Sequence, residues 1–183
     1  MRIISGEFRG RKLKTADLFE LRPATDRYRE TLFNILNNYI DLENKKVCDL
    51  YAGTGAIGFE CLSRGAEHCT FVERRFSTVK LIHENAKLLG IESKITVLKD
   101  TAERFTSITD EQFDVIFADP PYSSRTIYIT VKNILERNLI RSSGVLVIQR
   151  SKKTKEDDTK NFGFPNFRKI GGDLLFLKII GEC

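Results

Sequence analysis

The segment Asp119-Pro120-Pro121-Tyr122 directly follows the apolar run Phe113–Ala118, whose composition is typical of a buried strand. The two prolines have no N–H group to donate to a neighbouring strand, so the strand must end here. Its carboxyl end, where ligands bind in open α/β sheets, then presents a carboxylate, rigidly held backbone carbonyls and an aromatic ring. These groups suit an exocyclic amino group on a planar base, so the segment predicts chemistry on such a group.

A glycine-rich loop lies upstream, between a strand-like run at residues 46–51 and a helix-like run at Ala56–Ser63. Residues 53–58 have the spacing Gly-x-Gly-x-x-Gly of a dinucleotide-binding loop, and Glu73 lies 20 residues after the first glycine. Asp49 at the mouth of the loop would repel a pyrophosphate. It would attract S-adenosylmethionine, which has an ammonium and a sulfonium group and no phosphate. The loop therefore favours S-adenosylmethionine over NAD as the cofactor.

Acidic residues end four successive strand-like runs, and we expect their side chains to share one edge of a parallel sheet. Four carboxylates on one edge favour a cationic ligand. Glu73 is expected to accept from both ribose hydroxyls of the cofactor, and Asp100 from its adenine amino group. The predicted cofactor contacts are Asp49, Ala52, Gly53, Thr54, Gly55, Glu73, Asp100, Thr101 and Asp119.

Strand-like and helix-like patterns alternate through most of the chain, which predicts parallel strands with helices on both faces. Two final strand-like runs, Phe167–Ile170 and residues 174–180, are joined across Gly171-Gly172, a dipeptide that marks a tight turn. The expected fold is α/β: a doubly wound, mostly parallel seven-stranded sheet with a C-terminal antiparallel hairpin. This is the Rossmann-like variant found in class I S-adenosylmethionine-dependent methyltransferases. The expected helices begin near Asp26 and span Ala56–Ser63, Phe76–Leu89 and residues 127–138, whereas the charge-rich residues 152–161 are expected to form a loop.

Residues 1–24 are expected to form a basic arm with a small β-hairpin, made of residues 2–5 and 11–14, ahead of a methyltransferase domain at residues 25–183. The net charge of +5 is modest, so the placement of the charges matters more than their sum. Basic side chains interleaved with Phe8 and Gly10 are typical of a surface that binds phosphate backbones. The expected RNA contacts are Arg2, Arg9, Arg11, Lys12, Lys14, Arg22 and Arg27.

The composition argues against membrane and metal-binding classes. No apolar run approaches the ~18 residues that a membrane helix needs. The N-terminus becomes polar too early for a signal peptide, so a cytoplasmic location is expected. The four cysteines include no C-x-x-C pair, and only two histidines could assist them. We therefore expect no metal site, and we expect Cys48, Cys61 and Cys69 to be small buried hydrophobic residues.

The chain resembles the RsmD family, bacterial S-adenosylmethionine-dependent methyltransferases acting on the guanine N2 amino group of small-subunit ribosomal RNA. Four segments of the chain show this resemblance, and the first two are specific to the family: residues 2–13, 21–34, 49–58 and 119–122. The resemblance implies a 16S ribosomal RNA substrate within the 30S subunit or an assembly intermediate. It also implies that Thr25 and Arg27 reach the cofactor or the substrate. The chain departs from the family pattern at Gln149, where an acidic residue is expected.

The turn and the resemblance together predict that Asp119 and the Pro120 carbonyl accept the two N–H bonds of a guanine amino group. Pro121 would hold the turn rigid and Tyr122 would stack on the base. Neither a metal nor a covalent nucleophile is needed, and a monomer is expected. An adenine-N6 methyltransferase on DNA or RNA is the nearest alternative, because the same turn serves either amino group. A cofactor-sensing, RNA-binding module without catalysis and an NAD oxidoreductase are further alternatives.

Overall fold

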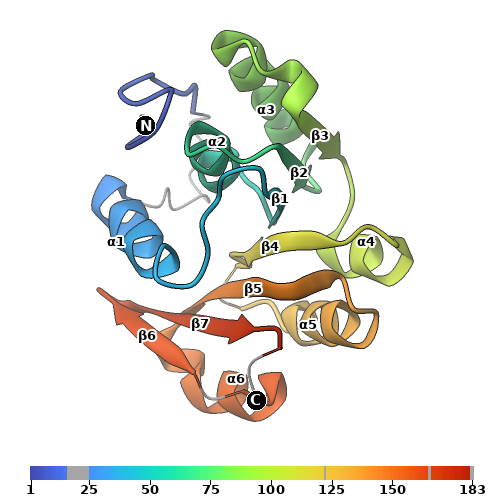
Figure 1. Ribbon diagram of the computed structural model, residues 1–183. Helices are drawn as coiled ribbons and strands as arrows, with labels where there is room; N and C mark the ends of the chain where they lie inside the picture. The colour runs from blue at the N-terminus through green and yellow to red at the C-terminus, as the bar shows by residue number, and fades with distance from the viewer. Residues whose placement is uncertain (16–24, 122, 165, 182–183) are drawn as a thin grey trace.

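The computed structural model describes residues 1–15, 25–121, 123–164 and 166–181, and the fold is built on one seven-stranded sheet (Figure 1). The strands β1 to β5 run parallel, whereas β7 is antiparallel to both of its neighbours, β5 and β6. The order across the sheet is β3-β2-β1-β4-β5-β7-β6. The predicted fold class is therefore confirmed. The strands are β1 Lys46–Leu50, β2 His68–Val72, β3 Ile95–Leu98, β4 Phe113–Ala118, β5 Ile140–Ser151, β6 Phe167–Ile170 and β7 Asp173–Ile179.

The strand order reverses between β1 and β4, which is the place where open α/β sheets bind their ligands. Leu50, the last residue of β1, is the register partner of both Val72 and Ala118. Ala118 is in turn the partner of Ile148 on β5. The residues that follow these four positions therefore meet at one edge of the sheet.

Helices cover both faces of the sheet, and successive strand residues point to opposite faces. Phe117 packs in the core cluster that includes α1, α2 and α3, and its ring lies 6.1 Å from that of Phe33. Ile116 packs in the second cluster, with Ile127 and Phe162 from α5 and α6. The helices are α1 Asp26–Leu36, α2 Ala56–Ser63, α3 Phe76–Leu89, α4 Ala102–Ile108, α5 Thr126–Glu136 and α6 Lys155–Phe162, with short 3₁₀ turns at Glu92–Lys94 and Lys152–Thr154.

The expectation of a loop at residues 152–161 is wrong, because a 3₁₀ turn and α6 occupy this stretch. The helix buries only Asp158 and Phe162, so the sequence shows no apolar period. Phe162 packs against Tyr128, Phe164 and Phe176. Helix α4, whose seven residues follow the capping residue Thr101, was not among the helices predicted from the sequence.

The N-terminal arm is a short antiparallel pairing with a single ladder bridge, between Arg2 and Lys12, and not a pair of regular strands. Ile3, Phe8 and Leu13 are buried in the same core cluster as α1, α2 and α3. The arm thus packs directly on the helices that cover this face of the sheet. Residues 16–24, which would join the arm to α1, lie outside the described residues.

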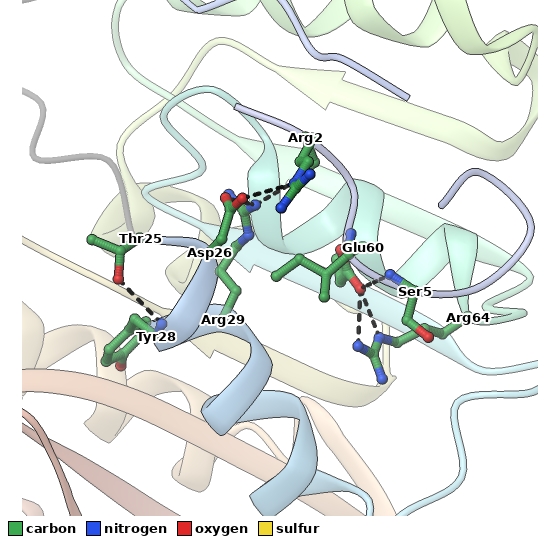
Figure 2. Close-up of polar contacts among 9 residues, drawn as sticks. Arg2, Ser5, Thr25, Asp26, Tyr28, Arg29, Glu60 and Arg64 are labelled. Atoms are coloured by element: carbon green, nitrogen blue, oxygen red, sulfur yellow. Dashed lines mark hydrogen bonds and ion pairs between the residues drawn. The ribbon is translucent and has the colours of Figure 1, made fainter. Parts of the chain in front are cut away.

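A buried carboxylate fixes the arm to α2. Glu60, which is 1% exposed, accepts hydrogen bonds from the backbone N–H groups of Ile4 (2.8 Å) and Ser5 (3.0 Å) and pairs with Arg64 (Figure 2). On the other side, Arg29 of α1 donates to the Arg2 carbonyl. The arm is therefore held to two helices through backbone groups.

Candidate active site

A cavity of about 1140 Å³ opens at the carboxyl edge of the sheet. Its walls contain one or more residues from the end of nearly every strand. Because the strand order is known, these residues fall in a fixed sequence along the edge. In that sequence they are Asp100 after β3, Glu73 after β2, Tyr51 after β1, Asp119 after β4, Gln149 on β5 and Asp173 at the start of β7.

Glu73 connects the glycine loop to the cavity. Its carboxylate accepts from the backbone N–H groups of Gly53 (2.9 Å) and Arg75 (2.8 Å), and it lines the cavity. A carboxylate has about four lone-pair sites, so both oxygens keep the capacity to accept from hydroxyl groups. The position is consistent with the ribose contact predicted for Glu73.

Ala52, Gly53, Thr54 and Gly55 form the turn between β1 and α2, next to the cavity and not in its lining. Gly53 and Gly55 have positive φ angles of 54° and 76°, which glycine adopts without strain. A Cβ atom on Gly55 would also lie 2.8 Å from the ring of Phe59 on α2 and 3.1 Å from that of Phe71 on β2. The glycines therefore allow α2 to start close to the sheet.

Asp49 lies beneath this turn and not at the mouth of the cavity. It is 4% exposed, does not line the cavity, and accepts a 3.0 Å hydrogen bond from the N–H of Gly58. Burial raises the pKa of Asp49 to about 8; the Gly58 hydrogen bond lowers it, and the charges of Asp119 and Glu73 raise it further. Asp49 can thus act on a cationic ligand through its charge only when it is ionised, and otherwise through the loop that it holds.

Asp100 and Thr101 line the cavity beside β3 and also shape the start of α4. Asp100 accepts from the N–H of Thr101 at 2.8 Å and pairs with Arg104 at 3.0 Å. The Thr101 hydroxyl caps α4 by accepting from the N–H of Arg104. Asp100 is consequently held in place and still faces the cavity.

Asp119 stands at the middle of the edge and is exposed to the cavity, whereas Pro120 behind it is buried. The surrounding protein replaces enough water to raise the pKa of Asp119 to about 7; Asp173 raises it further and Arg150 lowers it. The turn closes with a 2.8 Å hydrogen bond from the N–H of Ser124 to the Pro121 carbonyl. Tyr122, the predicted stacking residue, lies outside the described residues.

Tyr51 and Asp173 line the cavity but were not predicted as residues of the site. Tyr51 has a φ of 60°, unusual for a residue other than glycine, and its hydroxyl lies 3.2 Å from that of Thr130. Asp173 is 9% exposed and accepts a 3.2 Å hydrogen bond from Gln149. Asp173 reaches the cavity through the pairing of β7 with β5, which the local sequence does not show, whereas Tyr51 directly follows β1 at the carboxyl edge.

A buried ion pair between Arg150 and Asp158 joins the end of β5 to α6. The Nε of Arg150 lies 3.0 Å from both carboxylate oxygens of Asp158 on α6, and both residues are at most 1% exposed. Asp158 also accepts from the hydroxyls of Tyr128 (3.0 Å) and Thr154 (2.6 Å). The pair joins α6 to the strand that presents Gln149 to the cavity.

The predicted RNA contacts are dispersed. Arg2 pairs with Asp26 at 3.1 Å, and Lys14 pairs with Glu84 at 3.0 Å. Arg11 donates to the Leu88 carbonyl, and Arg9 and Lys12 are exposed on the arm. Arg27 lines the cavity, and Arg22 lies outside the described residues.

Thr25 and Arg27, which the family resemblance implies are near the cofactor or the substrate, both line the cavity at the start of α1. Thr25 caps this helix by accepting from the N–H of Tyr28 (Figure 2). Tyr28 and Thr31 continue the same wall. The first turn of α1 therefore faces the edge of the sheet across the cavity.

Within the described ranges, no group of three or more His, Cys, Asp and Glu side chains could hold a metal ion. Cys48, Cys61 and Cys69 are free cysteines, and the prediction that they are buried is confirmed. Across the same described residues, no helix has the length and apolar character needed to span a bilayer.

The chain is similar to known proteins along almost its whole length. The family model described as conserved hypothetical protein 95 matches residues 1–177. The ribosomal RNA small subunit methyltransferase D of Escherichia coli strain K12 is 39% identical over 139 residues, which is 75% of this chain and 68% of that protein.

Solved structures agree on the fold. The yhhF protein of Escherichia coli superposes with a TM-score of 0.83 at 24% identity, over 100% of this chain and 99% of that one. A precorrin-6y C5,15-methyltransferase from Geobacter metallireducens superposes with a TM-score of 0.70 at 13% identity, over 92% and 93% of the two chains. The fold is that of the class I methyltransferases, and the chain belongs to the conserved hypothetical protein 95 family, the RsmD family of ribosomal RNA methyltransferases.

Proposed function

We propose that this protein transfers a methyl group from S-adenosylmethionine to the N2 amino group of a guanine in small-subunit ribosomal RNA. The observation that supports this most is the order of groups along one edge: Asp100 and Glu73 on one side, Asp119 in the middle, Gln149 and Asp173 on the other. The cavity of about 1140 Å³ slightly exceeds the ~300–1,000 Å³ typical of sites for one small ligand. It can therefore accommodate a cofactor and a base together.

The side of the cavity near β2 and β3 fits S-adenosylmethionine. Glu73 can accept from ribose hydroxyls, and Asp100 from an adenine amino group. Glu73, Asp100 and Asp119 line the cavity with carboxylates, which favour a ligand with two positive charges and disfavour a pyrophosphate. When bound, S-adenosylmethionine supplies an electrophilic methyl group on its sulfonium sulfur.

Asp119 and the Pro120 carbonyl would act on the amino group of the target. The guanine N2 lone pair is delocalised into the ring, so the nitrogen is a poor nucleophile. Two fixed acceptors for its N–H bonds would favour a pyramidal nitrogen with its lone pair directed at the methyl group. As the N–CH₃ bond forms and the S–CH₃ bond breaks, one N2 proton must leave. With a pKa near 7, Asp119 is suited to accept that proton and release it to water.

The substrate class follows from the relatives and from the access that the chemistry needs. The Escherichia coli relative is named for small-subunit ribosomal RNA, and this chain shares 39% of its residues over the matched length. A guanine can reach a cavity of this kind only when it is unstacked or presented in a loop. We propose the small subunit or one of its assembly intermediates as the natural acceptor, and a monomer as the active form.

Transfer of a labelled methyl group tests this proposal. The acceptors are small-subunit particles that lack the modification, the RNA extracted from them, and DNA, each followed by nucleoside analysis. N2-methylguanosine from particles or RNA is the expected product. Label in adenine or in DNA would contradict the guanine assignment. Binding of the cofactor without transfer to any acceptor would favour a non-catalytic RNA-binding module.

A further inference from the structure

Phe76, the first residue of α3, is a large aromatic side chain that remains exposed to solvent. It is 67% exposed, and the mechanism above gives it no role. The Lys99 ammonium lies 5.6 Å from the centre of its ring, within the range of a cation–π contact. Arg74 and Arg75, the two residues before Phe76, line the cavity, as does Asp100, the residue after Lys99. The ring therefore lies beside the cavity, just outside its lining.

A stripe of exposed side chains leads away from Phe76 along α3. Lys80, His83 and Lys87 follow it at steps of four, three and four residues. Residues three and four apart are neighbours on a helix surface, so all four side chains lie on one face. Lys80, His83 and Lys87 are exposed. The helix thus presents an aromatic ring and two ammonium groups to solvent along one line.

The N-terminal arm contacts α3 at the other end of this stripe. The Arg11 guanidinium donates a 2.7 Å hydrogen bond to the Leu88 carbonyl. The backbone N–H of Lys14 donates a 2.8 Å hydrogen bond to the Asn85 side chain. Phe76 and Leu88 are 12 residues apart, about 18 Å along a helix that rises about 1.5 Å per residue. The exposed face of α3 therefore connects the basic arm to the edge of the cavity.

This face of α3 has a net positive charge. Glu84, the one acidic residue of the helix, pairs with Lys14 at 3.0 Å and also interacts with the charge of Lys80. Lys14, Lys80 and Lys87 together outnumber it. The cavity is lined by carboxylates, which repel phosphates. An RNA that places a base in this cavity must keep its backbone outside, where exposed lysines can neutralise phosphates.

We infer that the exposed face of α3, from the arm to Phe76, binds the single-stranded RNA next to the target guanine; this rests on the proposed function. Lys80 and Lys87 contact phosphates, and Phe76 stacks on a base that stays outside the cavity. An aromatic ring with basic neighbours is the usual composition of a single-stranded nucleic acid site. Unstacking the guanine costs free energy, and stacking of a neighbouring base on Phe76 offsets part of this cost.

Fluorescence anisotropy with a labelled, unstructured RNA oligonucleotide that contains no guanine tests the inference. Its binding does not depend on the target base, and stacking tolerates any base. Phe76→Leu keeps an apolar side chain but removes the ring, so it should weaken binding at least about fivefold. Phe76→Tyr keeps the ring and should bind within about twofold of the wild type. Ile129→Ala, at an exposed apolar position of α5 away from α3, should bind as the wild type does (Figure 1).

The lysines are tested with the same oligonucleotide at several salt concentrations. Lys80→Gln with Lys87→Gln should weaken binding and reduce the slope of log K against log salt concentration by roughly one to two. Phe76→Leu should leave the slope unchanged, because the ring neutralises no phosphate. Lys132→Gln with Lys160→Gln removes the same charge from α5 and α6 and should have little effect. Equal losses in the two double variants would overturn the role of the lysines.

Methyl transfer distinguishes failure of this inference from failure of the proposed function. Phe76→Leu should raise KM at least about fivefold for both small-subunit particles and their extracted RNA, with the affinity for S-adenosylmethionine unchanged. A wild-type protein that does not bind the oligonucleotide, or a Phe76→Leu variant that binds it equally well, would overturn the inference. A higher KM for particles alone would indicate that a protein of the particle occupies this face, and would overturn it too. The expected RNA binding without transfer to any guanine would overturn the proposed function and support the RNA-binding face.

Discussion

The backbone N–H of Gly53 donates a 2.9 Å hydrogen bond to the carboxylate of Glu73. The glycine loop after β1 and the acidic residue after β2 thus form one unit, although 20 residues separate them in the sequence. The second oxygen of Glu73 accepts from the N–H of Arg75. Any cofactor held by Glu73 is therefore positioned by the loop as well.

Glu73→Gln should weaken binding of S-adenosylmethionine at least about tenfold, because one buried N–H would face an amide donor and lose its acceptor. Isothermal titration calorimetry measures the change. Glu67→Gln removes the same charge at an exposed position beside β2 and should leave the affinity unaltered. Equal affinity in both variants would show that Glu73 does not contribute to the cofactor site.

The affinity for S-adenosylmethionine should rise with pH up to about 8. Burial raises the pKa of Asp49 to about 8, and the protein around the cavity-facing Asp119 displaces enough water to raise its pKa to about 7, so both are partly protonated near neutrality. The cationic ligand favours their ionised forms, so protons leave on binding and affinity grows as pH rises through these values. Calorimetric titrations from pH 6 to pH 9, in buffers of different ionisation enthalpy, measure the affinity and the number of protons released on binding. S-adenosylhomocysteine, which lacks the sulfonium charge, should show a weaker dependence; an affinity independent of pH would contradict the cationic-ligand account.

Arg150→Met should lower the free energy of unfolding by about 3–5 kcal/mol, because it leaves the buried Asp158 carboxylate without its cation. The double variant Arg150→Met with Asp158→Leu should recover most of that loss, since no unpaired charge remains. Urea unfolding followed by circular dichroism compares the two. A double variant as unstable as the single one would show that the pair has a larger structural role than charge compensation.

Arg9→Gln combined with Lys12→Gln should weaken RNA binding and reduce the slope of log K against log salt concentration by roughly one to two. Both side chains are exposed on the arm, whereas Arg2 and Lys14 pair with acidic residues and Arg11 donates to the Leu88 carbonyl. Point changes are preferable to deleting the arm, because Ile3, Phe8 and Leu13 belong to the core.

Fluorescence anisotropy with labelled RNA at several salt concentrations gives both the affinity and the slope. Lys132→Gln with Lys160→Gln changes the charge equally on α5 and α6, away from the arm, and should have little effect. RNA affinity lowered equally by both double variants would argue for a general charge effect and against a specific role of the arm.

Much of the fold was predictable because the residues that end strands and form turns act locally in the sequence. Proline pairs end strands, glycine pairs make turns, and apolar alternation reports burial, so residues 119–121 and the Gly171-Gly172 turn fell where the sequence indicated. The failure at α6 has a physical reason: its buried face consists of one aromatic ring and the charged Asp158, whose partner Arg150 lies on another element. A helix that is held to the fold by a buried ion pair has too few apolar residues to show a hydrophobic period in its sequence.

The site was only partly predictable because sequence order does not give side-chain direction or register. Asp49 lies near the end of a strand-like run, but it points beneath the loop toward Gly58 and not into the cavity. Successive residues of a strand point to opposite faces of the sheet. Cys48 and Leu50 pack in the cluster on one face, so Asp49 between them points to the other face, beneath the loop. Asp173 reaches the cavity only through the antiparallel pairing of β7 with β5, a relationship between segments 24 residues apart.

Turnover and cofactor affinity of Asp119→Asn, measured side by side, test the central claim most directly. The change keeps the size of the side chain but removes the negative charge that would stabilise the methylated amino group and accept its proton. We expect methyl transfer to small-subunit particles to fall at least ~100-fold, the scale for loss of one preorganised polar group, while S-adenosylmethionine still binds. Asp157→Asn should retain wild-type turnover. Near-normal transfer by Asp119→Asn would contradict the role of this edge of the sheet as the place where the methyl group moves.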